Sequence, residues 1–541
     1  MLDQLASPER AAAPPAALTG PRRRGTLAAG LMLVVVGVPL VLTPFTTAPF
    51  SDGKLVLLLA GTLLVAIGRR GRPLDRGLVL PAAAFVVIEL LAAAAGVDPM
   101  RSLLGLEQGG DSVTILCCAA VLLVAAPTFP QEVVVRLPKW FVGVGLAIAA
   151  VELLYRTAPG AVAAAVPDLS LVGSTLGNPV FAAAMLSVAL AVVVSRWKLT
   201  SFVTIACLVA IASGLGTVGE RSAYLVPLVA VTVALWRRRP GITRSLLVIG
   251  LVGGTLAAWI AIGRVLPATQ SSVSPVVEFE TSAAEQARFA VYSADANAFL
   301  HRPLLGWGPG NTWSAYVSSA SPREMATAGR GWADAHDLFL EVAVGGGVLA
   351  LAALVWLLLA GLQRARGVPP ERSWIVASAI ALGLFQLGEP VNVVVTPTLF
   401  LLVGLCVMPR AEAKEAPRGS AVRGASIACV GLLSAGLVLS TVAFAASTLE
   451  QWGRGYGEVW ADRASHAVAP WRVTAAENLA VRLAVDGRSG DASASREALA
   501  LSENLVAAHP WDPTVRLSAS DVARLLQRPG EADAWEMAQL R

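Results

Sequence analysis

The sequence predicts an all-α, polytopic membrane protein with about 12–13 transmembrane helices, and three observations support this class. Hydrophobic residues make up 55% of the 541 residues, which exceeds the roughly 45–50% typical of soluble domains. Apolar runs of about 15–25 residues recur between positions 26 and 446, and each is long enough to approach or cross the ~30 Å hydrocarbon layer. Basic residues also gather in every second connection between these runs, as cytoplasmic loops do.

Thirteen apolar runs account for the predicted membrane domain, 26–447. We expect spans at roughly 26–43, 54–68, 78–96, 112–128, 140–155, 178–195, 200–214, 221–236, 245–263, 337–362, 373–390, 394–409 and 424–447. With the N-terminus in the cytoplasm, the basic clusters then fall on one side throughout, and omitting one span would break this alternation. The predicted location is the cytoplasmic (inner) membrane, with the C-terminal tail on the external side.

The segment before the first span, 1–25, is rich in alanine and proline, a composition that predicts a disordered cytoplasmic N-terminus. Its last residues include Arg22, Arg23 and Arg24, which precede an apolar run as in a signal peptide. Because that run extends from 26 to 41, we interpret it as a retained first span.

One external connection, 264–336, is too long for a simple linker, and long loops usually carry function. Within it, the stretch 282–300 spaces Phe289, Tyr292, Ala296 and Phe299 at helical intervals. This pattern predicts an amphipathic helix lying on the membrane face. A turn rich in proline and glycine follows, "HRPLLGWGPGN".

The external tail, 448–541, contains two similar stretches. "APWRVTAAENLAVRLAVDGR" at 469–488 resembles "HPWDPTVRLSASDVARLLQRPG" at 509–530, about one helical-repeat period away. We interpret the tail as a small set of tetratricopeptide-like helix pairs. Such helices generally form a surface that braces a neighbour or binds a protein partner, and a helical appendage without a partner is the alternative.

Residue usage gives no indication of a metal, a cofactor or a nucleic-acid partner. The five cysteines all lie within apolar runs and form no CxxC pair, which is typical of small core residues. The four histidines are His301, His336, His466 and His509. They form neither an HxxxH nor an HExxH pair, so we expect no zinc site. The net charge of +5 is modest.

One histidine, His336, stands between two acids at the mouth of the apolar run that begins at 337. An imidazole titrates near neutral pH, so it can take a proton from a hydroxyl group. Asp334 and Asp337 are candidates to hold its tautomer, although residues one or two positions apart do not face each other on a helix. The alternative is a histidine at the interface with no chemical role.

Two arginines are predicted on the external side. Arg221 stands at the outer end of a span, and Arg288 lies on the predicted interfacial helix near Tyr292 and Asp295. A guanidinium group matches the geometry of phosphate oxygens, so both are candidates to bind a lipid headgroup or diphosphate. Alternatively, Arg221 extends to the interface beside lipid, and Arg288 lies on a solvated helix face.

Four acids, Glu89, Glu152, Glu341 and Glu389, lie in or near the predicted spans, where a charge is costly and usually functional. Glu89 and Glu389 have no evident partner in the sequence. They favour a second hypothesis, a transporter such as a flippase for lipid-linked saccharides. That hypothesis requires broken helices and paired repeats, and the sequence shows no convincing inverted repeat.

Several stretches, in order, resemble the O-antigen ligase/polymerase family of integral membrane glycosyltransferases. They are "DPMRSLLGLEQGGDSVT" at 98–114, "GSTLGNPVFAAAML" at 173–186, "GERSAYL" from 219, and "ARFAVYSADANAFLHRPLLGWGPGNTW" followed by "AHDLFLEVAVGGGVLAL". The resemblance covers most of 26–410. It implies a GT-C-like fold and transfer of a glycan from an undecaprenyl-diphosphate-linked donor to a hydroxyl of a glycan or lipid acceptor, without a metal or cofactor.

The same resemblance implies roles for the candidate residues. Arg221 and Arg288 are expected to bind the donor diphosphate, and His336 to activate or orient the acceptor, with Asp334, Asp337 and Tyr292 in support. The sequence departs from the family pattern at three positions: Asp337 replaces the usual asparagine, Val180 replaces the second asparagine of Gly-Asn-Pro-Asn, and Glu220 precedes Arg221. Whether the enzyme is a ligase or a polymerase, and which sugars it uses, stays open. A third interpretation is a scaffold whose main function lies in the tail.

Overall fold

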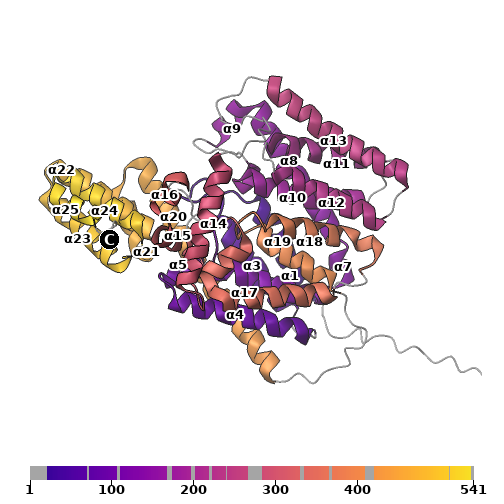
Figure 1. Ribbon diagram of the computed structural model, residues 1–541, viewed down its shortest axis with the longest axis horizontal. Helices are drawn as coiled ribbons and strands as arrows, with labels where there is room; N and C mark the ends of the chain where they lie inside the picture. The colour runs from indigo at the N-terminus through magenta and orange to yellow at the C-terminus, as the bar shows by residue number, and fades with distance from the viewer. Residues whose placement is uncertain are drawn as a thin grey trace, which may run out of the picture.

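A computed structural model describes most of the chain, and every regular element in the described part is a helix. This confirms the predicted all-α class (Figure 1). The structure describes residues 21–69, 72, 74–105, 110–166, 173–196, 201–218, 222–238, 241–265, 283–328, 334–364, 368–407, 420–510 and 512–537. The predicted disordered segment 1–25 lies almost entirely outside these residues.

Each of the thirteen predicted spans corresponds to a helical segment. These segments are α1–η1–α2 (Pro21–Met32, Leu33–Gly37 and Val38–Leu40), α3 (Asp52–Gly68), α4 (Arg76–Ala95), α6 (Val113–Ala125), α8 (Leu137–Thr157), α10 (Pro179–Arg196), α11 (Phe202–Val218), α12 (Ser222–Arg238), α13 (Ile242–Val265), α17 (Leu338–Arg364), α18 (Ser373–Phe385), α19 (Val395–Cys406) and α20 (Ser420–Tyr456). Within the described residues, six helical stretches are long and apolar enough to cross a membrane, and four shorter ones are apolar. The chain is therefore a polytopic helical membrane protein, while a count of 12–13 crossings stays a prediction.

The basic connections predicted to be cytoplasmic contact one another at one side of the bundle. The contacts are Arg24–Glu132 (3.1 Å), Arg372 to the Gln131 side chain (2.5 Å), Arg196 to the Glu371 carbonyl (3.2 Å) and Arg237 to the Val368 carbonyl (2.6 Å). Five connections that are far apart in the sequence thus share one side, as the alternation of basic loops requires. Which side faces the cytoplasm stays a prediction.

The helix that follows His336, α17, is interrupted in its first half at Gly347. This glycine has φ of +70°, a conformation that side chains with a Cβ rarely adopt. A Cβ added there would come within 2.2 Å of the Leu304 carbonyl oxygen. At this interruption the backbone N–H of Trp307 donates to the Val344 carbonyl (2.9 Å). The Pro/Gly-rich turn is thereby fastened to the helix that begins beside His336.

The external stretch predicted to be an amphipathic helix forms α14 (Ala283–His301), which confirms the helix. Phe289 on the predicted membrane face is 67% exposed, whereas Val291, Ala294 and Ala298 are buried against the protein. Small residues permit close packing against α15 (Thr312–Ser319) and α17, so the larger aromatic side chain faces outward. A membrane contact of this outer face stays a prediction.

The tail consists of short helices that pack as neighbours at one end of the molecule (Figure 1). They are α21 (Val459–Val468), α22 (Val473–Arg488), α23 (Ala492–Ala508), α24 (Pro513–Leu525) and α25 (Pro529–Met537). Leu479, Leu483, Ala498 and Val522 form part of their common apolar core. Helix α20 runs past the predicted boundary at 447 and continues to Tyr456. A helical tail is thus present, and its tetratricopeptide character stays a resemblance.

The tail docks on the membrane domain through charged side chains that precede α24. Asp512 pairs with Arg101 at 2.5 Å, and His509 lies 3.4 Å from Asp98. Burial would raise the pKa of Asp98, but the hydrogen bond from His509 and the Arg101 backbone N–H outweigh it and hold the pKa below its usual value. For Asp512, the Arg101 charge and hydrogen bonds likewise outweigh burial and lower the pKa. Both carboxylates are therefore charged at neutral pH.

We expect Arg101→Ala to loosen the tail. The pair is nearly closed to solvent, with side-chain exposures of 12% for Arg101 and 4% for Asp512. Removing one partner of a buried pair leaves an uncompensated charge and typically costs about 3–5 kcal/mol. Limited proteolysis near Gly457 of the protein in detergent should be correspondingly faster. Arg528→Ala is the control, because its pair with Glu531 is about half exposed and contributes little; equal cleavage of Arg101→Ala and wild type would contradict the docking.

Candidate active site

A cavity of about 410 Å³ lies where several connections between membrane helices meet. Its lining residues are 47–51, 110–111, 176–178, 181, 310, 334, 336, 341 and 389–393. They come from the starts of helices α3, α10 and α17, from the turn between α18 and α19, and from the segments just before α6 and α15. Many of the stretches that carried the family resemblance, distant along the chain, thus contribute to one cavity.

His336 reaches this cavity in an unusual backbone conformation. Its φ is +51°, which is uncommon for a residue with a side chain and often marks a functional site. The Asp334 carboxylate contacts Nδ1 of the imidazole and also accepts a hydrogen bond from the His336 backbone N–H (3.2 Å). A carboxylate at Nδ1 favours the tautomer that carries its lone pair on Nε2. Asp334 therefore sets both the position and the tautomer of the ring.

Helix α14 brings Arg288 and Tyr292 to the same place, one turn apart. The Tyr292 hydroxyl donates to the His336 carbonyl at 3.3 Å. The Arg288 guanidinium lies 3.6 Å from the carboxylate of Glu389, which lines the cavity and is 4% exposed. The imidazole thus lines the cavity, and the guanidinium group lies beside it through its pair with a lining carboxylate.

Asp337 has a different role from the one considered in the sequence. Its carboxylate accepts hydrogen bonds from the backbone N–H groups of Phe339 and Leu340, both at 2.8 Å. It therefore caps the N-terminus of α17, whereas Asp334 alone of the two acids has a described contact with the imidazole. Aspartate and asparagine cap helices equally well, which explains why Asp337 can replace the asparagine of the family pattern.

The sequence reasoning missed the turn 386–394 as a part of the cavity. The predicted span 373–390 was too long, because α18 ends at Phe385. The stretch "GEPVN" at 388–392 carried the signal, since glycine and proline interrupt helices. Glu389, which had no evident partner in the sequence, pairs with Arg288. Its place at the cavity removes one of the two observations that favoured a transporter.

A further acid, Asp111, was not singled out in the sequence. It lines the cavity, is 3% exposed, and accepts a hydrogen bond from the Gly310 backbone N–H at 3.3 Å. Burial raises the pKa of Asp111 to about 7, against the opposing effect of hydrogen bonds from the backbone of Gly310 and Ser112. The carboxyl of Glu341 lies near enough for the two negative charges to repel each other. The cavity therefore resists the ionisation of Asp111.

The raised pKa of Asp111 predicts a specific dependence of stability on pH. The folded-state pKa of Asp111 lies above the ordinary 3.8. The contribution of this group to the free energy of unfolding is therefore complete below about pH 3.8 and is lost as the pH rises through 7. We expect the thermal unfolding midpoint in detergent to fall between pH 4 and pH 7 and Asp111→Asn to flatten this fall. Parallel curves for the variant and wild type would contradict the assignment.

Of the two arginines expected to bind a diphosphate, the structure places Arg288 only. Arg221 lies outside the described residues, so its relation to the cavity stays a prediction.

Asn178 of the Gly-Asn-Pro stretch lines the cavity, and its side-chain oxygen caps α10 by accepting from the Val180 backbone N–H (2.9 Å). Val180, the departure from the family pattern, is buried.

The fold and the site together define a polytopic helical membrane protein with a polar, histidine-bearing cavity assembled from inter-helix connections. Residues 206–355 match the family model described as "O-Antigen ligase". This segment runs from α11 to α17 and includes Arg288, Tyr292 and His336. The match confirms the resemblance to the O-antigen ligase/polymerase family seen in the motifs and supports an enzyme with a role in cell-surface polysaccharide synthesis. No curated protein matches the chain.

Proposed function

We propose that the protein transfers a glycan from an undecaprenyl-diphosphate-linked donor to a hydroxyl group of a glycan or lipid acceptor. The transfer takes place in the cavity around His336, on the side of the membrane opposite the basic connections. The observation that carries the proposal is that His336 lines the cavity and that Arg288, within the same O-antigen ligase domain, pairs with Glu389, another residue of the cavity lining. A base and a phosphate-binding cation are the two groups that this reaction needs.

Arg288 is assigned to the donor diphosphate. As the glycosidic bond breaks, negative charge grows on the diphosphate oxygen that leaves, and a fixed cation at that oxygen lowers the barrier. The ion pair with Glu389 (3.6 Å) orients the guanidinium group before the donor arrives. Arg221, which lies outside the described residues and directly precedes α12 in the sequence, is proposed to bind the same diphosphate. In this proposal the guanidinium groups, rather than a metal ion, neutralise the leaving group.

His336 is assigned to the acceptor. The acceptor oxygen forms a bond to the anomeric carbon of the donor sugar while the bond from that carbon to the diphosphate oxygen breaks. The electron pair of the broken bond leaves with undecaprenyl diphosphate, and Nε2 of His336 takes the hydroxyl proton. Asp334 at Nδ1 stabilises the imidazolium that forms. Tyr292 holds the backbone of His336 in place.

The proposal is tested by deleting the gene from the source organism and restoring it as wild type or as His336→Asn, with membrane levels compared by immunoblotting. We expect the wild type alone to restore the surface glycan. Loss of long chains identifies a polymerase, and intact polymer that accumulates on its carrier lipid identifies a ligase. A normal surface glycan in the deletion strain would contradict the proposed function.

A further inference from the structure

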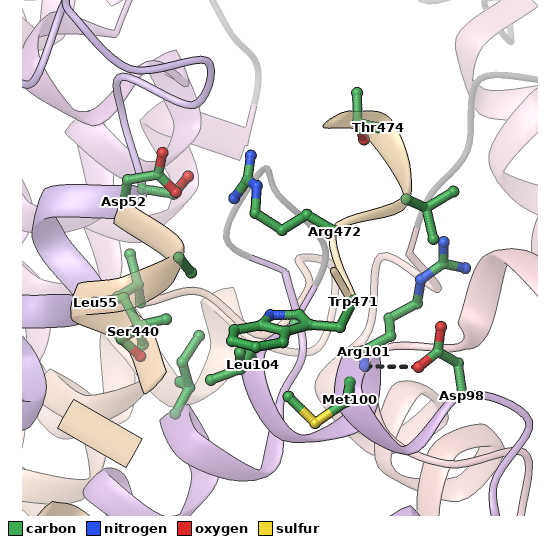
Figure 2. A pocket seen from close by; sticks show the side chains of 16 residues that line it. Asp52, Leu55, Asp98, Met100, Arg101, Leu104, Ser440, Trp471, Arg472 and Thr474 are labelled. Atoms are coloured by element: carbon green, nitrogen blue, oxygen red, sulfur yellow. Dashed lines mark hydrogen bonds between the residues drawn. The ribbon is translucent and has the colours of Figure 1, made fainter. Parts of the chain in front are cut away.

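A second cavity, of about 100 Å³, adjoins the cavity around His336 and shares Ser51 and Val393 with it. Its walls come from the start of α3, from the loop helix α5 (Pro99–Leu104), from α20 and from the tail residues just before α22. Figure 2 shows the Trp471 indole extending from the tail into this space, with Arg472 above it and Met100 and Leu104 below. The tail thus completes a pocket beside the proposed catalytic cavity.

Two polar groups in this pocket have no hydrogen-bond partner among the residues that the structure describes. They are the indole N–H of Trp471 and the hydroxyl of Ser440, a residue that is only 3% exposed. A buried polar group without a partner costs about 1–3 kcal/mol. Such groups are therefore expected to bind a ligand or water in the pocket.

Arg472 fixes the tail at the rim between the two cavities. It is 6% exposed and donates to the Thr47 hydroxyl (3.1 Å) and to the Glu450 carboxylate (3.3 Å). Thr47 lines the catalytic cavity, whereas Glu450 belongs to α20. The position of Trp471, the next residue, is consequently determined by contacts with the membrane domain rather than by the tail alone.

We propose that this pocket binds one sugar ring of the glycan substrate, so that the tail is a part of the substrate-binding site. A pyranose presents an apolar C–H face and a rim of hydroxyl groups. Trp471 offers an aromatic surface with a polar N–H at its edge, while Ser440 and the Asp52 carboxylate offer polar partners on the opposite wall. The inference rests on the proposed function, since it names the substrate class of the same site.

The size and the position of the pocket both fit a single ring. At about a quarter of the volume of the catalytic cavity, it lies well below the 300–1,000 Å³ of a pocket for a larger ligand. Because the two cavities share lining residues, a glycan whose reacting end lies beside His336 can place a neighbouring sugar under Trp471. The lining carries the carboxylates of Asp52 and Asp98. Its two arginines, Arg101 and Arg472, are already paired with the carboxylates of Asp512 and Glu450, so the pocket offers no excess positive charge to a phosphate group.

Binding is measured without turnover, by titrating the oligosaccharide repeat, cleaved from its carrier lipid, into the full-length protein in detergent. We expect Trp471→Phe and Ser440→Ala each to weaken binding by up to about 10-fold, because each removes one hydrogen-bonding group. Trp460→Ala is the control, since Trp460 is a tail tryptophan that is 56% exposed and lies outside the pocket. Unchanged affinity in Trp471→Phe, Trp471→Ala and Ser440→Ala would show that the pocket holds water only and overturn the inference.

Steady-state kinetics identify which glycan occupies the pocket. Loss of an interaction that is equally strong in the ground state and the transition state raises KM and leaves kcat nearly unchanged. We expect Trp471→Phe to raise KM several-fold for one substrate: the acceptor if the ring belongs to the acceptor, and the donor if it belongs to the donor chain. A decrease in kcat with both KM values unchanged would contradict a binding role. If the wild type transfers no glycan, the proposed function fails, while the titration still decides whether the pocket binds sugar.

Discussion

Replacing His336 with asparagine is expected to lower the initial rate of glycan transfer in washed membranes by at least about 100-fold, the lower range for the loss of a general base. Asparagine is chosen because it tolerates positive φ better than most residues, and His336 has φ of +51°. The backbone beside α17 should therefore keep its conformation, and the loss should fall on kcat. The protein should still insert into the membrane at wild-type levels.

His301→Ala is the matched control for this variant. His301 lies in the same external segment, at the end of α14, is exposed, and contacts the Ser319 side chain outside the cavity. We expect its rate to stay within about twofold of wild type, since surface substitutions of this kind have small effects. Wild-type rates in His336→Asn would show that another group takes the acceptor proton.

The second large effect is expected for Arg288→Ala, which should lower the rate of transfer by about 100- to 1,000-fold, as the loss of one charge-stabilising donor does in other enzymes. Arg288→Lys should recover only part of this activity, because an ammonium group keeps the charge but lacks the planar fork that fits two phosphate oxygens. In Arg288→Ala, transfer from a lipid-linked donor with a poorer leaving group than diphosphate should lose more of its rate than transfer from the natural donor.

Arg323→Ala controls for a general loss of positive charge in the external segment. Arg323 lies on α16 (Pro322–Ala328), is exposed, and does not line the cavity. The Arg323→Ala variant should transfer glycan at the wild-type rate. Full activity in Arg288→Ala would remove Arg288 from the site and leave Arg221 as the remaining candidate.

Most of the fold follows from the sequence, because burial in a bilayer requires long apolar helices and leaves few alternatives. All thirteen predicted spans coincide with helical segments, although their ends differ. One boundary error concerned the stretch 386–390, "QLGEP", which the predicted span included although α18 ends at Phe385. Hydropathy alone does not register the break, which Gly388 and Pro390 impose on the backbone.

The site was predicted in part. His336, Arg288 and Tyr292 were found through motifs, and the structure places them together. Glu389 and Asp111 were not recognised as site residues, because their roles depend on contacts with segments far away in the sequence. Asp337, considered as a support for the imidazole, has its described hydrogen bonds at the start of α17, since a carboxylate before a helix bonds to backbone N–H groups more readily than to the adjacent side chain.

The tail shows most clearly what a sequence pattern omits. The repeated Pro-Trp turns indicated helix pairs, and helices are present. Nothing in that pattern indicated that the turns face the membrane domain. The first turn supplies Trp471 and Arg472 to the pocket beside the catalytic cavity, and the second supplies Asp512 to the pair with Arg101. Such contacts depend on tertiary packing and leave no periodic signal.

The most direct measurement uses the purified full-length protein in detergent, mixed with an undecaprenyl-diphosphate-linked glycan and an acceptor, with release of undecaprenyl diphosphate followed over time. Transport needs a sealed compartment, whereas glycosyl transfer does not. We predict that the wild type releases undecaprenyl diphosphate in step with glycosylated acceptor and that His336→Asn and Arg288→Ala release almost none. Intact donor after incubation with the wild type, or equal release by all three proteins, would contradict glycan transfer at this cavity.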